Sequence, residues 1–419
     1  MFEGPGPGAA LKRYSHPPRP YPSSAAARSI KIATTEREKE EIYRLRYKVY
    51  IEEMRGQNRH TEADNRKKQL RDHWDDRAYH FYIEQDGVVA ACARLNLRQD
   101  GPLECEEHFD MEGFRPSFPS HVCMTSRLVL HPKLRGGHLL KQLTCGMYRF
   151  SLERQMRYNF IDCHPQLLPL YSRLGYRVYR AGFNHHKYTY VIPLVLDLVD
   201  IDHLKRVRSP FGSVARHLGY SSSRSVSNSW ESHQPSGHAD HADTDNSQLF
   251  AELSAFGLFD QAATREKTEL FEGLTPEEAK TLVCLGHIIS CRAGDSVLNP
   301  GDPGREIFII LSGSFQVQRR TNSHSTGEVK VLKILSAGDT FGEMRFLREE
   351  LRHASVKARE DSILLILNAK VLDRLVITEP RVAAKIFRNL ASIVATRLCD
   401  SVRFARFSKR RTAGRSTPI

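Results

Sequence analysis

Apolar positions in the first half of the chain alternate between helical and strand spacing. Between residues 42 and 49 they recur with the period of an amphipathic helix. Two runs that favour strands, 80–84 and 88–95, flank Asp86-Gly87, a dipeptide typical of a tight hairpin turn. Further segments follow in the order strand, turn, helix, strand, helix and buried strand, at residues 126–130, 132–137, 139–150, 159–163, 167–174 and 190–199. This alternation, with two strand-to-helix crossovers, predicts an α/β domain that is not a Rossmann repeat.

The pattern breaks between residues 208 and 250, where Ser, His, Asp and Asn predominate without an apolar period. Such a composition is typical of a flexible linker. It divides the chain into an N-terminal domain at 30–207 and a C-terminal domain at 251–400. Residues 1–29, rich in Pro, Gly, Ala and Ser, are expected to be disordered, and residues 401–419 to form a basic tail.

Short apolar runs separated by turn residues predict a mainly β domain in the second half. Thr275 as a cap and Pro276 in the first turn predict the helix that opens it. The apolar run 307–311 leads to a break at Gly313 and then to a second strand. Two turn sequences, a further strand and a helix with apolar residues near the helical period complete the pattern, at 292–295, 301–304, 363–367 and 386–398.

Length and composition indicate a soluble protein of two or three domains. Single cores stop growing near about 250–300 residues, and this chain has 419. Hydrophobic residues make up 40% of the chain, but no apolar run approaches the ~18 residues of a membrane span, so no transmembrane segment is expected. The eight cysteines form no C-x-x-C pair, which favours reduced thiols and a cytoplasmic protein. No spacing of Cys or His predicts a metal site.

Residues 341–356 carry the most informative pattern in the chain. Gly342 lets the backbone approach a ligand closely, and the short helix expected after it points free N–H groups at an anion. Glu343 can accept both hydroxyl protons of a ribose, and Arg352 supplies the planar fork that fits a phosphate. The segment resembles the cyclic nucleotide-binding family, which carries Phe-Gly-Glu, eight residues and then Arg-x-Ala-Ser/Thr-Val. The resemblance implies a β jelly roll with flanking helices over residues 251–400.

The resemblance also implies a cyclic nucleotide effector and the residues that would bind it. Arg345 replaces the usual Ala and Leu351 the usual Pro, so a barrel that has lost its ligand is the alternative. His353 stands where guanine-selective members often place Thr, which favours cyclic AMP over cyclic GMP. The expected binding residues are Phe341, Gly342, Glu343, Met344, Arg345, Arg352, His353, Ala354 and Ser355.

The net charge of +13 is partly concentrated after Asp400, where Arg and Lys occur without an acidic residue. Such a tail can contact nucleic acid or anionic lipid, although a solvated tail is the simpler interpretation. Transcription factors with this sensor domain carry a helix-turn-helix beyond it, and only about twenty residues remain here. No specific DNA binding is therefore expected.

The N-terminal domain resembles the GNAT acyltransferase fold. Residues 127–137 are similar to its strand and phosphate-binding turn, and residues 170–177 to its Tyr-x-x-x-Gly-Phe/Tyr segment. Within that superfamily, residues 44–53 resemble the opening segment of acyl-homoserine lactone synthases and long-chain N-acyl amino acid synthases. The acidic and Arg positions of those enzymes correspond here to Asp75, Asp76, Arg94 and Arg127.

The resemblance places an acyl donor at the turn after the strand, because backbone N–H groups that open a helix bind phosphate. His138 and Leu140 replace two small residues of the coenzyme A version of this turn, so close approach of a pyrophosphate is not implied. Many of the related synthases use acyl-carrier protein, and a basic surface suits that acidic carrier. The expected donor is acyl-carrier protein or acyl-CoA, bound by Arg127, Arg135, Gly136, Gly137 and His138. A solvated turn residue is the alternative for Arg135.

Acyl transfer needs backbone N–H groups for the oxyanion, a base or water for the amine proton and an acid for the thiolate. Tyr171 falls where GNAT enzymes often keep that acid, and a tyrosine packed on the core is the alternative. Met124 replaces a Glu of the lactone synthases, which weakens that particular assignment. His164 could also face the site, although a structural His before a Pro is the simpler interpretation. Three candidate bases carry no order of preference: Glu53, Asp76 and Glu84.

Three functions are compatible with these observations. The first is an N-acyltransferase that acts on a small amine and is regulated by a cyclic nucleotide. The second is a non-catalytic cyclic nucleotide sensor or scaffold with a degenerate acyltransferase domain. The third is a cyclic nucleotide-regulated protein lysine acetyltransferase, which the missing coenzyme A glycines disfavour. We expect the first.

Overall fold

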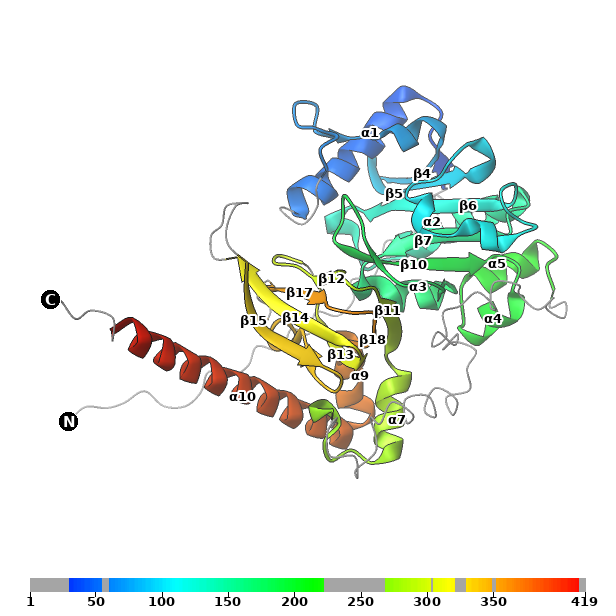
Figure 1. Ribbon diagram of the computed structural model, residues 1–419. Helices are drawn as coiled ribbons and strands as arrows, with labels where there is room; N and C mark the ends of the chain where they lie inside the picture. Colours follow the sequence, from blue (N-terminus) through cyan, green and yellow to red (C-terminus); the bar gives the residue numbers. More distant parts are fainter. Residues whose placement is uncertain are drawn as a thin grey trace, which may run out of the picture.

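The computed structural model describes residues 30–54, 60–221, 268–302, 304–320, 329–348 and 352–413. They form two domains, drawn in blue to green and in yellow to red in Figure 1. The segment 1–29 and most of the predicted linker, together with the predicted start of the C-terminal domain, lie outside the described residues. Within the described part, no helix has the length and apolar character needed to cross a membrane.

An eight-stranded mixed sheet forms the centre of the N-terminal domain. Its order is β1-β4-β5-β6-β7-β10-β8, with β9 beside β10. Only β6 and β7 are parallel neighbours, and α2 connects them. The strands are β1 (Lys31–Ile32), β4 (Tyr79–Gln85), β5 (Val88–Leu97), β6 (Val122–Leu130), β7 (Tyr158–Cys163), β8 (Arg177–Val178), β9 (Phe183–Asn184) and β10 (Tyr190–Asp197). A separate ribbon pairs β2 (Ala63–Asp64) with β3 (Gln69–Leu70).

The predicted crossovers and hairpin are present. Asp86 and Gly87 join β4 to β5 with φ of 53° and 76°, the left-handed pair that a tight hairpin turn requires. The second crossover, β7–α3–β8, skips one position in the sheet, which β10 fills as an antiparallel strand between them. The first crossover therefore makes its two strands direct neighbours in the sheet, and the second does not.

Helices cover both faces of the sheet. Apolar residues of α1 (Glu36–Tyr47) pack on Tyr82, Val89 and Cys92, whereas those of α2 (Leu139–Glu153) pack on the opposite face. A short π-helical segment, η1 (Lys48–Glu53), continues α1 toward the sheet. The remaining helices are α3 (Leu168–Leu174), α4 (Ile201–Arg206) and α5 (Phe211–His217).

The linker boundary predicted at 208 is wrong, because α5 belongs to the N-terminal domain. Phe211 of α5 stacks on Tyr148 of α2, with ring centroids 4.5 Å apart and planes 5° apart. Phe211 is 2% exposed. Phe211 thus lies in the core of the N-terminal domain, although it follows the position at which the composition of the chain becomes polar.

The C-terminal domain is a jelly roll of two four-stranded sheets. The sheet orders are β11-β18-β13-β16 and β12-β17-β14-β15, the interleaved order that two Greek keys produce. The strands are β11 (His287–Cys291), β12 (Ser296–Leu298), β13 (Glu306–Ser312), β14 (Ser314–Arg320), β15 (Val329–Ser336), β16 (Thr340–Phe341), β17 (Ser355–Ala358) and β18 (Ser362–Asn368). At the predicted break, Gly313 has φ of 89° and carries the chain from one sheet to the other.

Helices flank the jelly roll as expected. They are α7 (Pro276–Cys284), capped by Thr275, α8 (Glu343–Leu347), α9 (Ala369–Thr378) and α10 (Pro380–Ala413). The basic tail predicted from 401 is corrected, because α10 continues to Ala413 and projects from the domain as a long helix (Figure 1). Ile386, Leu390 and Ile393 are buried, but Leu398 is 64% exposed, so the apolar stripe ends before it.

Direct hydrogen bonds join the two domains where the start of β10 lies near β11 and β12. The Gly182 N–H and the Tyr190 hydroxyl both donate to the Ser290 carbonyl at 3.0 Å. Asn184 Nδ2 donates to the Asp295 carboxylate at 3.1 Å. Gly182 suits this close approach, because a Cβ there would lie 2.2 Å from the Tyr190 hydroxyl oxygen. The C-terminal domain is therefore docked on the N-terminal domain.

A network of buried charges stabilises the N-terminal domain. Arg94 of β5 and Arg127 of β6 both donate to the Asp72 carboxylate. Lys187 donates to Asp72 at 3.1 Å and to Glu104 at 2.9 Å. The side chains of all five residues are at most 10% exposed. Removing one member would leave a buried charge unpaired, which typically costs about 3–5 kcal/mol.

The network lowers the pKa of its carboxyl groups. Burial opposes ionisation of Asp72, but the charges of the three surrounding basic groups outweigh it and hold the pKa of Asp72 well below its usual range. Burial also opposes ionisation of Glu62 at the edge of the network. There the hydrogen bond from His60 and the charge of Lys187 lower the pKa of Glu62 to about 2. The ionised forms of both groups therefore stabilise the folded state.

We expect the free energy of unfolding to fall as the pH decreases from about 5 to about 2. A carboxyl whose folded pKa is lowered contributes stability above its unfolded pKa, about 4, and loses it as the pH passes its folded pKa. The Glu62→Gln variant should show a smaller fall. Urea unfolding followed by Trp74 fluorescence, in a Trp230→Phe background, measures it. Glu153→Gln, at the exposed end of α2, is the control, and equal slopes for Glu62→Gln and the parent would contradict the expectation.

Candidate functional site

Strands β6 and β7 run side by side only in their first halves. Their pairing ends at Met124 and Phe160. On its other edge β6 carries a bulge, because the step from Cys92 to Arg94 in β5 faces three residue steps in β6. Arg127, at the bulge, has a left-handed φ of 55°. A bulge bends and twists its strand, so β6 diverges from β7 toward their carboxyl ends.

A cavity of about 530 Å³ occupies the opening between the two strands. The second half of β6, the end of β7, α3 and the turn before α2 line it, with η1 on the remaining side. Most of the lining side chains are apolar. Five predicted site residues lie in this wall, Arg127, Arg135, Gly136, Gly137 and Tyr171, whereas Glu53, Asp76 and His138 do not.

Arg127 forms part of the cavity wall with its guanidinium already engaged. It donates to the Tyr188 hydroxyl and to Asp72, both at 2.5 Å, and is 4% exposed. The guanidinium also lies 5.5 Å from the centre of the Tyr50 ring. Arg127 therefore fixes the shape of the cavity and has little capacity left for a free anion.

The turn predicted to bind the donor lies at one mouth of the cavity. Arg135 holds the Glu53 carboxylate with two bonds of 2.5 and 2.7 Å, and both side chains are partly exposed. Gly136 has φ of 89° and open space where a Cβ would lie. His138 precedes α2, with its side chain exposed and outside the cavity. Glu53 thus serves as the anionic partner of Arg135, which corrects its prediction as a base.

Tyr171 of α3 faces the cavity and is 9% exposed. Burial raises the pKa of Tyr171 well above its usual value, so the hydroxyl keeps its proton. Asp76 is corrected as a base, because it is exposed and bound to Arg71 at 2.6 Å. Glu84 likewise points away, toward Lys31 at 3.0 Å.

Two carboxyl groups that line the cavity were missed as site residues. Glu104 accepts from Arg94 and Lys187, at 2.5 and 2.9 Å. Asp162, in β7, has no cation partner among the described residues. An Asp between Ile161 and Cys163, inside a strongly apolar strand, was the sequence signal that could have identified it. The predicted His164 does line the cavity, and burial lowers its pKa.

Beside the cavity, Cys105, His185 and His186 bring ligand-type atoms within 4.8 Å of one another, a cluster found among the described residues. Nδ1 of His185 accepts the N–H groups of Lys187 and Tyr188, so the neutral ring carries its proton on Nε2. Burial raises the pKa of Cys105 to about 12, so its sulfur is a thiol. A cation would have to displace the thiol proton of Cys105 and the hydrogen bonds at Nδ1 of His185, so the cluster is not arranged as a metal site.

The segment 341–355 forms a turn and a short helix in the C-terminal domain. Gly342 joins β16 to α8 with φ of 92°, and a Cβ there would lie 2.6 Å from the Glu306 carbonyl oxygen. Phe341 stacks on Phe308, with centroids 4.9 Å apart. The turn therefore lies directly against β13, and only Gly fits it.

Arg352 is buried and held in one orientation. Its guanidinium donates to the Gly342 carbonyl at 2.8 Å and to the Glu306 carbonyl at 3.1 Å. Arg352 Nε and Glu306 Oε1 are buried without a hydrogen-bond partner in the described part of the chain. Burial lowers the pKa of Arg352 and raises that of Glu306. Buried polar atoms of this kind fit a bound polar group such as a phosphate.

Glu343, the residue predicted to bind ribose, is 4% exposed and pairs with Arg397 of α10 at 2.5 Å. A ribose would therefore have to share or replace Arg397. Arg345 donates to the Gly304 carbonyl at 2.7 Å and adds a second cation near Arg352. The other predicted residues lie at the edge: Met344 is half exposed, His353 is exposed, and Ala354 and Ser355 are partly buried.

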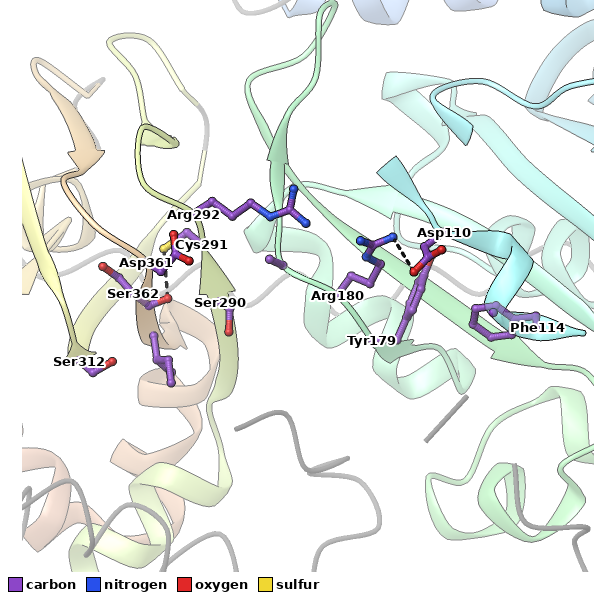
Figure 2. A pocket seen from close by; sticks show the side chains of 13 residues that line it. Asp110, Phe114, Tyr179, Arg180, Ser290, Cys291, Arg292, Ser312, Asp361 and Ser362 are labelled. Carbon is purple, nitrogen blue, oxygen red and sulfur yellow. Dashed lines mark hydrogen bonds and ion pairs between the residues drawn. The ribbon is translucent and has the colours of Figure 1, made fainter. Parts of the chain in front are cut away.

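A second cavity, of about 480 Å³, lies between the two domains (Figure 2). Arg180, which pairs with Asp110 at 3.4 Å, lines it from the N-terminal domain. Arg292, Asp361 and Ser362 line it from the C-terminal domain. It contains none of the predicted site residues. Beside this cavity, buried apolar residues of both domains belong to one cluster.

Comparisons with known protein families agree with the two sites. The family model described as N-acyl amino acid synthase FeeM matches residues 41–197, which contain the cavity between β6 and β7. The model described as cyclic nucleotide-binding domain matches residues 288–379, which contain Glu343 and Arg352.

Individual relatives cover only part of the chain. A Cyclic AMP receptor protein of Thermus thermophilus is 34% identical over 132 residues, which are 32% of this chain and 58% of that protein. Glutaminase 1 of Bradyrhizobium diazoefficiens is 33% identical over 144 residues, or 34% of this chain and 22% of its own. The solved structure of Thermus thermophilus Catabolite Activator Protein is 30% identical with a TM-score of 0.30, covering 34% of this chain and 63% of that one. The chain spans less than two thirds of the length of each relative.

The family matches and the described geometry identify the two parts of the chain. The first part matches the N-acyl amino acid synthase FeeM model, and the second, a jelly roll, matches the cyclic nucleotide-binding domain model. The chain thus joins a region similar to N-acyl amino acid synthase FeeM to a C-terminal region similar to cyclic nucleotide-binding domains.

Proposed function

We propose that the N-terminal domain has the GNAT fold and transfers an acyl group from a carrier-protein or CoA thioester to a small amine. A cyclic nucleotide bound to the C-terminal domain controls the rate. The observation that carries this proposal is the apolar cavity in the opening between β6 and β7. A thioester arm that lies between two diverging strands can use their free backbone groups, and the apolar wall excludes water from the acyl chain.

The two ends of the cavity suit the two ends of a long thioester. Leu140, Leu167 and Leu170 offer apolar contacts for an acyl chain. At the mouth, Arg135 and the turn before α2 suit the phosphate of a phosphopantetheine arm. Because Glu53 already neutralises Arg135, an incoming phosphate must exchange with that carboxylate. The turn can exchange Glu53 for a single phosphate more easily than it can accommodate a pyrophosphate. This favours acyl-carrier protein over acyl-CoA as the donor.

Tyr171 is the proposed acid of the reaction. Its hydroxyl lies in the cavity and keeps its proton because burial raises its pKa. When the tetrahedral intermediate collapses, the C–S bond breaks and the thiolate takes the electron pair. Tyr171 can then supply the proton that converts this thiolate into a thiol.

Purified protein should release thiol from decanoyl-acyl carrier protein faster than from acetyl-CoA when small amines are present. Arg135→Ala should raise the KM for the carrier protein about 10-fold, because losing one charged contact costs about 1.5 kcal/mol. Arg149→Ala, an exposed arginine on α2, is the matched control and should leave KM unchanged. Rapid turnover of acetyl-CoA without carrier-protein activity would instead support a lysine acetyltransferase.

Cyclic AMP is the proposed effector. The orphaned Arg352 Nε and Glu306 Oε1 suit a phosphodiester, and Glu343 suits a ribose. One relative is named Cyclic AMP receptor protein, and His353 stands where a guanine-selective pocket often has Thr. The nucleotide would also compete with Arg397 for Glu343, and so change how α10 packs on the domain.

Cyclic AMP should raise the melting temperature of the full chain, and Arg352→Ala should weaken its binding about 10- to 100-fold, the equivalent of about 1.5–3 kcal/mol. Isothermal titration calorimetry measures the affinity. Arg359→Ala, an exposed arginine one residue beyond the end of β17, is the control and should bind normally. Heat of binding from neither cyclic AMP nor cyclic GMP would favour a barrel that has lost its ligand.

A single loop connects the proposed nucleotide site with the acyl cavity. In the loop between β12 and β13, the Gly301 N–H donates to the Arg352 carbonyl at 3.0 Å. Asp302, next in the loop, shares a hydrogen bond with the Thr189 side chain of the first domain. Gly304 lies against Gln166, which lines the acyl cavity. Movement of Arg352 on nucleotide binding would therefore reach the cavity wall through one loop.

Reciprocity tests this regulation. If cyclic AMP changes the affinity for the acyl donor by a given factor, the donor must change the affinity for cyclic AMP by the same factor, typically about 5- to 150-fold. Thr189→Val, which removes the bond to Asp302, should reduce that factor while nucleotide affinity without donor stays the same. Thr281→Val, at an exposed position of α7, should leave that factor unchanged. Equal nucleotide affinities with and without donor in the parent protein would show that the domains are merely joined.

A further inference from the structure

Asp162 differs from every other carboxyl group around the acyl cavity. Its strand, β7, loses its neighbour β6 beyond Phe160, so Asp162 lies where the two strands have separated. It lines the same cavity as Tyr171 and the donor-side turn. A group at this point faces the space in which a thioester carbonyl between the strands would meet an amine.

The other carboxyl group in the cavity wall, Glu104, is committed to ion pairs. It is bound by Arg94 and Lys187, whose charges outweigh its burial and lower the pKa of Glu104. Asp162, in contrast, accepts a hydrogen bond only from its own backbone N–H, among the described residues. Its carboxyl group therefore retains the capacity to accept a substrate proton.

The electrostatic surroundings of Asp162 suit proton transfer near neutral pH. Burial and the negative charge of Glu104 raise the pKa of Asp162 to about 7, and Arg127 and Arg94 oppose this only in part. Neutral thiols and phenols also interact with it, from its own strand and from neighbouring elements: Cys163, and Cys105, Tyr171 and Tyr188. A base is most effective when its pKa lies near the working pH.

We propose that Asp162 is the general base of the acyl transfer, a catalytic residue that takes the proton of the attacking amine. This inference rests on the acyltransferase function proposed above. The amine nitrogen forms a bond to the thioester carbonyl carbon while the C=O electron pair moves to oxygen. Asp162 takes one proton from the ammonium before this attack and releases it to solvent afterwards, and collapse of the intermediate breaks the C–S bond. The thiolate takes the proton of Tyr171, which regains one from the attacking nitrogen, so the products are one amide and one thiol and no other reactant is needed.

The step gives a role to Asp162, a cavity carboxyl group that has no ion pair among the described residues. An amine that arrives as an ammonium cation must lose a proton before its lone pair can attack. A carboxylate fixed by an arginine would be too weak a base, as Glu104 is. Asp162 escapes such pairing because Arg94 and Arg127 are already occupied by Asp72 and Glu104. The buried charge network thereby leaves one carboxyl group free to act.

The test uses the full-length protein with cyclic AMP, decanoyl-acyl carrier protein as donor and a mixture of the twenty standard amino acids as acceptor. Thiol release and amide formation are followed from pH 5 to 9. Wild-type kcat/KM should rise with an apparent pKa near 7, the value to which burial raises Asp162. Asp162→Asn should lower kcat about 100- to 10,000-fold and remove this acid limb, with the KM for the donor unchanged. Asp86→Asn, in the exposed β4–β5 turn where Asn also accepts a positive φ, is the control.

Two further measurements separate chemistry from folding. Formate should partly restore activity to Asp162→Ala, because a small carboxylate can occupy the vacated position, and a merely structural role predicts no rescue. Hydroxylamine, which is unprotonated at neutral pH, should suffer a smaller defect in Asp162→Asn than the amino acids do. Unchanged kcat and pH profile in a folded Asp162→Asn protein would overturn the role of Asp162. Absence of amide from every amine in the wild-type protein would instead overturn the proposed acyltransferase function itself.

Discussion

The divergence of β6 from β7 is the constraint on which the rest of the N-terminal domain depends. A bulge in β6 places Arg127 in a left-handed conformation and turns the second half of the strand away from its parallel neighbour. The sheet thereby gives up ladder hydrogen bonds in its centre. In return, a cavity forms with strand backbone on two sides. The start of α2 and one face of α3 complete its wall.

That opening is stable because buried charges close the sheet beneath it. Arg94 and Arg127, one from each strand beside the bulge, converge on Asp72. Such a network is costly to bury but costlier to break, so it fixes the arrangement of the wall even where strand pairing is missing. It also gives the two acidic groups of the cavity different surroundings. Glu104 is held as an ion-paired carboxylate, whereas Asp162 has no ion pair among the described residues.

The second domain is placed so that Arg352 and the cavity between β6 and β7 lie on either side of one loop. Tyr190 of β10 and Gly182 fix one contact on Ser290, while the β12–β13 loop lies between Arg352 and Gln166. The hollow between the domains limits the area of this interface (Figure 2). An interface that includes such a cavity is easier to rearrange than a fully packed one, which suits a regulatory contact.

The sequence by itself determined much of the local structure in both domains. The Asp86-Gly87 turn, the strand and helix order and the Gly342–Arg352 spacing depend on local backbone preferences or on short motifs, which a linear pattern preserves. Only the tertiary structure decided which charges meet. Asp76 and Glu53 looked as suitable as any base, yet one lies on the surface and the other binds Arg135. Asp162 looked like a strand residue, and its environment arises from residues distant in sequence, Glu104 and the arginines, whose proximity follows from sheet order and not from spacing.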